Sequence, residues 1–278
     1  MQPTIARLDC YPVKSLDAVT LDSARLSTGG GLKHDRAWAI VTSPAGEPLP
    51  EHDPGAGGVY CNGKQTPAVH RLRSTVDLAA ETIAIRETTA TSTEQFSLDD
   101  TTALNAWLSD FFEQPVSVRR TDDVGYFDDQ SLSGPTVIST ATLETVASWF
   151  DDINVAEMRR RFRANIEIGG VSPFWEDRLF ADHGEHVAFR IGDVAFEGHN
   201  PCQRCVVPTR NPDTGEPTPG FRETFIRNRK RTLPEWVSSE RFDHAYRLMV
   251  NTRVPESEWE QSIAVDDPVE IIGIHSTE

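Results

Sequence analysis

The stretch IARLDCYPV, residues 5–13, decides our interpretation of the fold, because it is rich in strand-forming residues and opens a series of similar runs. Short β-rich runs follow it at residues 19–26, 37–41, 69–76 and 82–86. Glycine and proline clusters at residues 28–32 and 51–58 separate these runs as turns or loops. This pattern favours a small antiparallel β-barrel over βαβ units, and we predict such a barrel for a first domain at residues 1–98.

The remainder of the chain, residues 99–278, is predicted to form a second domain in which strands again dominate. Polar residues at 100–102 predict the start of a helix that ends near residue 112. A hydroxyl residue, Ser139 or Thr140, opens a second predicted helix, and a third is expected at residues 154–162. Further strands are expected at residues 165–168, 186–191, 194–196, 244–251 and 269–274. The fold class is therefore mainly β with peripheral helices (α+β).

The length of 278 residues is enough to bury a sizeable core and excludes a short scaffold held together by disulfides. No window reaches the roughly 20 consecutive apolar residues that a membrane-spanning helix needs. The N-terminus also lacks the basic and apolar regions of a secretory signal. We therefore expect a soluble, cytoplasmic protein that does not bind membranes.

Acidic residues outnumber basic ones by 43 to 27, which gives a formal net charge of −16. The electrostatic field of this negative charge repels nucleic acids and anionic lipids, so we expect no nucleic-acid partner. Only four of the basic residues are lysines, and the acidic residues are scattered along the chain. The pattern is halophile-like, typical of a cytoplasm in which multimolar salt shortens the Debye length to roughly 3 Å. An ordinary acidic protein is the alternative.

Cys202 and Cys205, two residues apart, have the one cysteine spacing that suggests chemistry. A structural zinc site would need further ligands, and the remaining thiols stand alone at Cys10 and Cys61. A thioredoxin-like redox pair would need a βαβ context, whereas the surroundings here look antiparallel. Two alternatives stay open beside these: a thiolate bonded to a soft metal, favoured by the adjacent Arg204, and two buried thiols with no chemical role.

Positive charge is concentrated at residues 159–163 and 222–231 of this otherwise acidic chain. Guanidinium groups bind phosphate through two hydrogen bonds, and beside the hydroxyls of Ser139 and Thr140 they would form a compact anion pocket. A solvated face or a network of surface ion pairs is the alternative for most of these arginines.

Lys14 beside Ser15, followed by Asp35-Arg36, is a further candidate for holding an anion. A lysine at the end of a strand supplies a point charge, and the serine hydroxyl supplies a second donor. None of the eight histidines has the spacing H-E-x-x-H, and neither a G-x-S-x-G nor a Walker-type sequence is present. Hydrolase and nucleotide-triphosphatase functions therefore lack support.

Taken together, these segments resemble the MOSC family, named for the C-terminal domain of molybdenum cofactor sulfurase, preceded by its usual N-terminal β-barrel domain. Segments in the family's order occur at residues 11–15 (YPVKS), 31–38 (GLKHDRAW), 162–166 (FRANI), 202–216 (CQRC to NPDTGE) and 267–269 (DPV). The architecture is similar to that of the mitochondrial amidoxime-reducing component and its bacterial relatives, which reduce N-hydroxylated compounds. The resemblance implies that residues 99–278 form a MOSC β-barrel that binds the molybdenum cofactor (Mo-molybdopterin).

The resemblance also implies roles for particular residues. It makes Cys205 the metal ligand and catalytic residue, with Cys202 as its neighbour. The residues that it implies for binding the cofactor are Lys14, Ser15, Arg36, Ser139, Thr140, Arg163, Asn165 and Cys205. Two residues depart from the closest relatives, because Asn211 replaces an aspartate and Asp266 replaces a glycine.

The activity that the resemblance implies is that of a molybdenum-dependent oxidoreductase, which removes oxygen from small N-hydroxylated or N-oxide substrates. The electrons would come from a separate flavin or iron–sulfur protein, because the sequence holds no cysteine cluster for an iron–sulfur centre of its own. A cofactor-binding or sulfur-carrying module without its own turnover fits the motifs almost as well.

Overall fold

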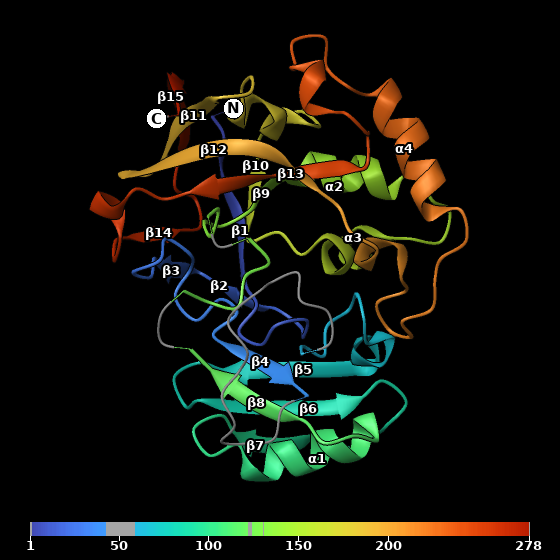
Figure 1. Ribbon diagram of the computed structural model, residues 1–278. Coiled ribbons are helices and arrows are strands. Elements are labelled where there is room, and N and C mark those ends of the chain that lie inside the picture. Colours follow the sequence, from blue (N-terminus) through green and yellow to red (C-terminus); the bar gives the residue numbers. More distant parts are fainter. Residues whose placement is uncertain (1, 43–58, 122–123, 130, 278) are drawn as a thin grey trace.

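The computed structural model describes residues 2–42, 59–121, 124–129 and 131–277 (Figure 1). Its largest sheet, in the upper half of Figure 1, has the strand order β15-β11-β12-β13-β9-β10-β1-β2. Neighbouring strands are antiparallel except for β9 and β10, which are parallel. The strands are β1 (Thr4–Cys10), β2 (Val19–Leu21), β9 (Val137–Ser139), β10 (Ile166–Gly169), β11 (Glu185–Ile191), β12 (Val194–Gln203), β13 (Arg247–Arg253) and β15 (Val269–Ser276).

Three smaller sheets complete the β-structure of the described residues. One joins β3 to β14, another joins β4 to β8, and the third has the order β5-β6-β7. The last two lie together in the lower half of Figure 1. The strands are β3 (Ser23–Arg25), β4 (Trp38–Val41), β5 (Leu72–Asp77), β6 (Thr82–Glu87), β7 (Glu94–Ser97), β8 (Ser117–Arg120) and β14 (Ser262–Ala264).

The residues that the structure describes form four α-helices outside the sheets: α1 (Thr102–Phe112), α2 (Thr140–Ala147), α3 (Val155–Phe162) and α4 (Phe221–Arg231). Ser139 caps α2 by accepting a hydrogen bond from the Thr142 N–H, and Asn154 caps α3 by accepting one from the Glu157 N–H. Short 3-10 turns occur at Pro67–Arg71, Trp175–Leu179, Val207–Thr209, Ser239–Arg241 and Glu256–Glu258. Among the residues described, no helix is both long and apolar enough to cross a membrane.

The predicted fold class, mainly β with peripheral helices, is confirmed. The strand pairings of the described residues do not form a closed barrel in either part of the chain, so barrel closure stays a prediction. The large sheet nevertheless curves so that β1 approaches the edge strand β15. Thr4 in β1 forms a bridge with Pro268, the residue immediately before β15. The Ile5 N–H donates to the Asp267 carbonyl at 2.9 Å and reinforces this contact.

Several predicted elements need correction. The run at 19–26 is divided into β2 and β3, and the start of the run at 69–76 is a 3-10 turn that begins at Pro67, a residue suited to the first turn of a helix. The strand predicted at 194–196 continues to Gln203 as β12. Four elements were not predicted from the sequence: β7, β8, β14 and α4. The predicted loop at 51–58 lies outside the described residues.

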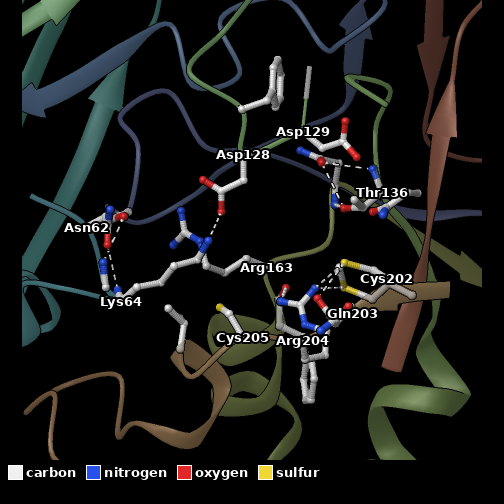
Figure 2. Close-up of a pocket in the computed structure, with 18 of the residues that line it drawn as sticks. Asn62, Lys64, Asp128, Asp129, Thr136, Arg163, Cys202, Gln203, Arg204 and Cys205 are labelled. Atoms are coloured by element: carbon white, nitrogen blue, oxygen red, sulfur yellow. Dashed lines mark hydrogen bonds and ion pairs between the residues drawn. The ribbon is translucent and has the colours of Figure 1, made fainter. Parts of the chain in front are cut away.

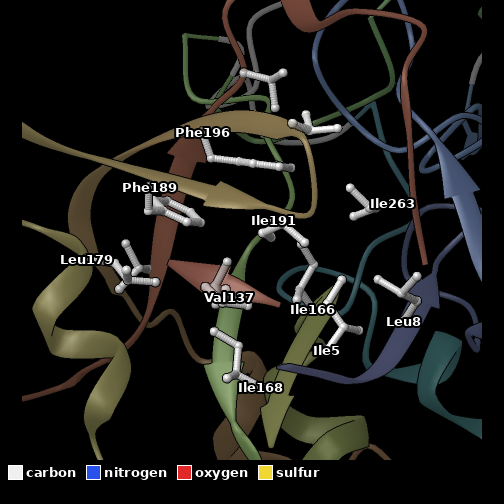
Figure 3. Close-up of a cluster of buried hydrophobic side chains, with 14 of the residues drawn as sticks. Ile5, Leu8, Val137, Ile166, Ile168, Leu179, Phe189, Ile191, Phe196 and Ile263 are labelled. Atoms are coloured by element: carbon white, nitrogen blue, oxygen red, sulfur yellow. The ribbon is translucent and has the colours of Figure 1, made fainter. Parts of the chain in front are cut away.

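Each part of the fold has its own apolar core. One core lies on the large sheet, where Ile5, Ile168 and Phe189 come from strands far apart in the sequence (Figure 3). A second core joins β4–β8 to α1 through residues such as Trp38 and Leu108. Because α1 and β8 share this second core, both pack against the N-terminal strands. The domain boundary between residues 98 and 99 stays a prediction.

A buried polar network joins α2 to the 3-10 turn at Trp175–Leu179. The Ser139 hydroxyl donates to Thr142 Oγ1 at 2.8 Å, and the Thr142 hydroxyl donates to Glu176 Oε2 at 3.0 Å. The neighbouring Asp177 accepts a hydrogen bond from Arg229 of α4, and both of these side chains are buried. Burial, together with the charge of Asp177, raises the pKa of Glu176 to about 7.

This raised pKa predicts a pH-dependent stability. Because the folded state favours protonated Glu176, the stabilisation is complete below the ordinary glutamate pKa of 4.5 and is lost as the pH rises to about 7. Each pKa unit corresponds to about 1.4 kcal/mol. In Glu176→Gln this contribution disappears, so urea unfolding should show the variant gaining stability relative to the natural protein between about pH 5 and pH 8. A difference in unfolding free energy that is constant over this range would contradict the assignment.

Candidate functional site

A cavity of about 770 Å³ lies where the N-terminal strands meet the ends of β12 and β13. Segments far apart in the chain line it, among them residues 14–17, 62–64, 127–129 and 202–205 (Figure 2). The predicted site residues that line it are Lys14, Ser15, Arg36, Arg163, Asn165 and Cys205. Six of the eight predicted site residues are therefore brought together at one cavity. Ser139 and Thr140 do not line it, and the Ser139 side chain is buried as the cap of α2.

Three of the six residues adopt left-handed backbone conformations that non-glycine residues rarely take. The φ angles are 73° for Ser15, 56° for Arg36 and 58° for Arg163. Such a conformation costs about 1–2 kcal/mol per residue, and it persists only where the surrounding structure fixes it. Strained backbone of this kind concentrates at functional sites, which supports a binding role for this cavity.

Asp35 organises one wall of the cavity. Its buried carboxylate accepts hydrogen bonds from the Tyr11 N–H at 2.7 Å and from Asn165 Nδ2 at 3.1 Å, and it pairs with Arg36. Asn165 also donates to the Asp9 carbonyl at 3.0 Å. Asp35 thus fixes two predicted site residues, Arg36 and Asn165, to the end of β1. Asp35 stands beside Arg36 in the sequence, but no sequence pattern predicted this positioning role.

Arg163 ends α3 and points across the end of β1. Its Nη1 donates to the Leu16 carbonyl at 2.7 Å, and its guanidinium lies 4.1 Å from the centre of the Tyr11 ring. The guanidinium of Arg36 lies 5.4 Å from the centre of the same ring. Burial lowers the pKa of Arg163, and the charge of Arg36 adds to this effect. Two cations held against one aromatic ring favour an anionic ligand nearby.

Lys14 and Lys64 meet at a single carboxylate, that of Asp128. Lys14 Nζ lies 2.7 Å from one Asp128 oxygen and 2.6 Å from the Tyr126 carbonyl, and Lys64 Nζ lies 2.6 Å from the other oxygen. Burial lowers the pKa of Lys14, whereas the two lysines outweigh burial and lower the pKa of Asp128. Half of the chain's four lysines therefore lie at this cavity. The scarcity of lysine was the one available signal for Lys64, and nothing in the sequence signalled Asp128.

The two thiols of the cavity have different surroundings. Cys205 is a free, partly exposed thiol, and no hydrogen bond to it occurs in the described residues. Cys202, near the end of β12, lies 3.1 Å from Arg204 Nη1, and Arg204 Nη2 donates to the Phe162 carbonyl at 3.0 Å. Figure 2 shows Cys202 beside the Arg204 guanidinium and Cys205 toward Lys64. The charge contact expected from Arg204 is thus made with Cys202.

The surroundings of the two thiols support neither a structural zinc site nor a thioredoxin-like redox pair. Within the described part of the chain, no group of three or more His, Cys, Asp or Glu side chains is arranged to hold a metal ion, so Cys202 and Cys205 lack the further ligands of a structural zinc site there. Cys202 lies in the antiparallel pair β12-β13 rather than in a βαβ unit, so the context of a thioredoxin-like pair is missing. A metal bonded to Cys205 would need its other ligands from outside the protein.

A mainly β protein with a free thiol in the wall of a cation-lined cavity is equipped to hold an anionic group that carries a soft metal. Comparison with known proteins agrees with this class. The family model described as the MOSC N-terminal beta barrel domain matches residues 2–115, and that described as the MOSC domain matches residues 134–270. The chain belongs to the MOSC-domain family.

Three similar proteins are all named molybdenum cofactor sulfurase. The one from Drosophila mojavensis is 27% identical over 245 residues, which cover 82% of this chain and 30% of the relative. The one from Oryza sativa subsp. japonica is 23% identical over 74% of this chain and 28% of the relative, and the one from Caenorhabditis briggsae is 24% identical over 79% and 31%. The chain thus spans under a third of the length of these relatives. These matches support a function related to the molybdenum cofactor.

Proposed function

We propose that the chain binds the molybdenum cofactor in this cavity and reduces small N-hydroxylated or N-oxide compounds. The observation that carries the proposal is the free thiol of Cys205 in the wall of a cavity lined by Lys14, Lys64, Arg36 and Arg163. A thiolate is a preferred protein ligand for a soft metal, and lysine and arginine bind the phosphate of an anionic cofactor.

The residues present fit this cofactor. Cys205 Sγ would bond the metal, and the residues that would hold the phosphate and pterin are Lys14, Ser15, Arg36, Arg163 and Asn165. Buried Nε atoms of Arg160 and Arg204, which both line the cavity, have no hydrogen-bond partner and are available as donors. Ser139 and Thr140 do not line the cavity, so they would affect cofactor binding only indirectly, by holding the start of α2 in place.

The bound cofactor would supply a metal that accepts oxygen from the substrate and cycles between two oxidation states. The balance of the reaction is that an N–OH group, two electrons and two protons give an N–H group and water. The chain's own residues bind and orient: the cations neutralise the cofactor, and Asp128 holds both lysines in place. The electrons would come from a separate flavin or iron–sulfur protein. The absence of disulfides among the four cysteines supports a reducing, cytoplasmic location.

A second candidate function is that of a cofactor-binding or sulfur-carrying module without turnover. It is favoured by the presence of two free thiols at one cavity and by the name of the similar proteins, molybdenum cofactor sulfurase. Sulfur transfer would require a persulfide on Cys202 or Cys205, which forms when the thiolate takes the outer sulfur of a small-molecule persulfide and releases that molecule as a thiol. Mass spectrometry after incubation with a sulfur-labelled small-molecule persulfide would detect it.

The experiment that separates the two functions is a turnover assay. Protein produced with molybdate is given an amidoxime and reduced viologen as an artificial electron donor. The proposed function predicts viologen oxidation that depends on the amidoxime and forms the amidine in the ratio of two electrons per substrate. Protein that contains molybdenum but forms no amidine would overturn the reductase proposal, and a persulfide in the same protein would favour the sulfur carrier.

A further inference from the structure

A second cavity, of about 520 Å³, lies beside the first, between β1, the β5-β6 pair and α3. Its volume falls in the range of small-molecule sites. Six arginine side chains line it: Arg7, Arg73, Arg86, Arg159, Arg160 and Arg163. A chain with a net charge of −16 thus gathers six arginines at one cavity, and the proposed cofactor site uses only Arg160 and Arg163 of them.

The carboxylates at this cavity do not balance the arginines. Asp9 and Asp17 line it, and Arg159 and Arg160 bond to Glu167 and Asp213. Six guanidinium groups therefore face four carboxylates. Asp213 is shared, because Arg73 Nη2 also lies 3.0 Å from it. The cavity keeps an excess of positive charge, which an anion would neutralise.

Arg86 is the clearest unbalanced cation of the set. Its Nη1 contacts only backbone carbonyls, those of Glu87, Thr88 and Ala90, at 3.2–3.3 Å. No ion pair of Arg86 occurs among the described residues. The cavity is also lined by the hydroxyls of Ser74, Thr75 and Thr93, and its apolar lining comes from three alanines and the ring of Tyr11. Guanidinium groups and hydroxyls are hydrogen-bond donors that bind the oxygens of a phosphate group.

We propose that this second cavity is a binding site for a phosphate-bearing small molecule, separate from the cofactor. Four residues line both cavities: Asp17, Arg73, Arg160 and Arg163. The ring of Tyr11, against the Arg163 guanidinium, lines the second one. An anion bound in the second cavity therefore contacts a wall that it shares with the cofactor site. The proposal rests on the arginine cluster and does not depend on the reductase activity.

Titration calorimetry with inorganic pyrophosphate, at constant ionic strength, tests the proposal. We expect binding of one pyrophosphate per chain. Arg86→Gln should weaken it by about tenfold or more, because a charged hydrogen-bond donor is lost. Thr93→Glu should weaken it as strongly, because it adds a carboxylate to the cavity from an exposed residue and leaves every arginine in place.

Two control variants locate the binding. Arg190→Gln removes an exposed arginine of β11 that contacts only the Asp193 carbonyl, far from either cavity, and should leave the affinity unchanged. Lys64→Gln removes a cation that lines only the first cavity, and it too should leave the affinity unchanged. The absence of binding, or binding that Lys64→Gln weakens and Thr93→Glu does not, would overturn the proposal.

Discussion

Replacing Cys205 by alanine is expected to remove molybdenum from the protein and to abolish amidoxime reduction. Cys205 is the partly exposed free thiol that we assign as the metal ligand. Loss of a residue that merely orients a metal ligand already costs about 10–100-fold in affinity or activity, so loss of the ligand itself should exceed about 100-fold. Elemental analysis and the viologen assay measure the two effects.

Cys202→Ala is the matched control for this experiment. The Cys202 thiol lies at the same cavity but contacts Arg204, so its loss should leave the molybdenum content close to that of the natural protein. Unfolding midpoints of both variants separate loss of the ligand from loss of the fold. Equal molybdenum content in Cys205→Ala and the natural protein would refute the assignment of Cys205, and the reverse order of the two variants would move it to Cys202.

Replacing Gly198 by alanine is expected to destabilise the fold severely. Gly198 lies within β12, and a Cβ atom there would lie 1.7 Å from the Leu179 carbonyl oxygen, which belongs to backbone and cannot turn aside. The sheet or the 3-10 turn at Trp175–Leu179 would have to move. Overpacking of this kind costs about 1–3 kcal/mol when side chains can adjust, so we expect a loss above about 3 kcal/mol in urea unfolding.

Gly273→Ala is the control for the strand environment. Gly273 also lies within a strand, β15, but its nearest neighbour would be 3.9 Å from the added Cβ, and its φ angle is not positive. The free energy of unfolding should change by less than about 0.5 kcal/mol. If Gly198→Ala is as stable as Gly273→Ala, the close packing of β12 against Leu179 is wrong.

Local sequence patterns predicted the elements that are also locally determined. The strand-rich run at 5–13 becomes β1, and the helix expected from polar residues 100–102 to near residue 112 becomes α1, with Leu104 and Leu108 buried. The helix α4 was missed because its buried face contains Arg229, which is stabilised by Asp177 from a distant segment. No helical pattern of apolar residues could show that ion pair.

The candidate site was predictable only where motifs carried it. Lys14 and Arg163 were found from the family segments, whereas Asp128 was not, since its pairing with Lys64 depends on the tertiary fold. Ser139 was predicted from the sequence as a cofactor-binding residue but does not line the cavity. A hydroxyl at the start of a helix can either cap the helix or bind an anion, and Ser139 caps α2. Asp266, at the position where the family resemblance led us to expect glycine, adopts a φ of 73°, a conformation that favours glycine.

Our central proposal is that the first cavity, of about 770 Å³, holds a molybdenum-bearing pterin whose metal is bonded to Cys205. The most direct test is elemental analysis of protein made with molybdate in a host that produces the cofactor, combined with release of the fluorescent oxidised pterin. We predict about one molybdenum and one pterin per chain, as one metal-binding cysteine implies. Protein that contains neither, or that contains zinc bound through both Cys202 and Cys205, would contradict the account.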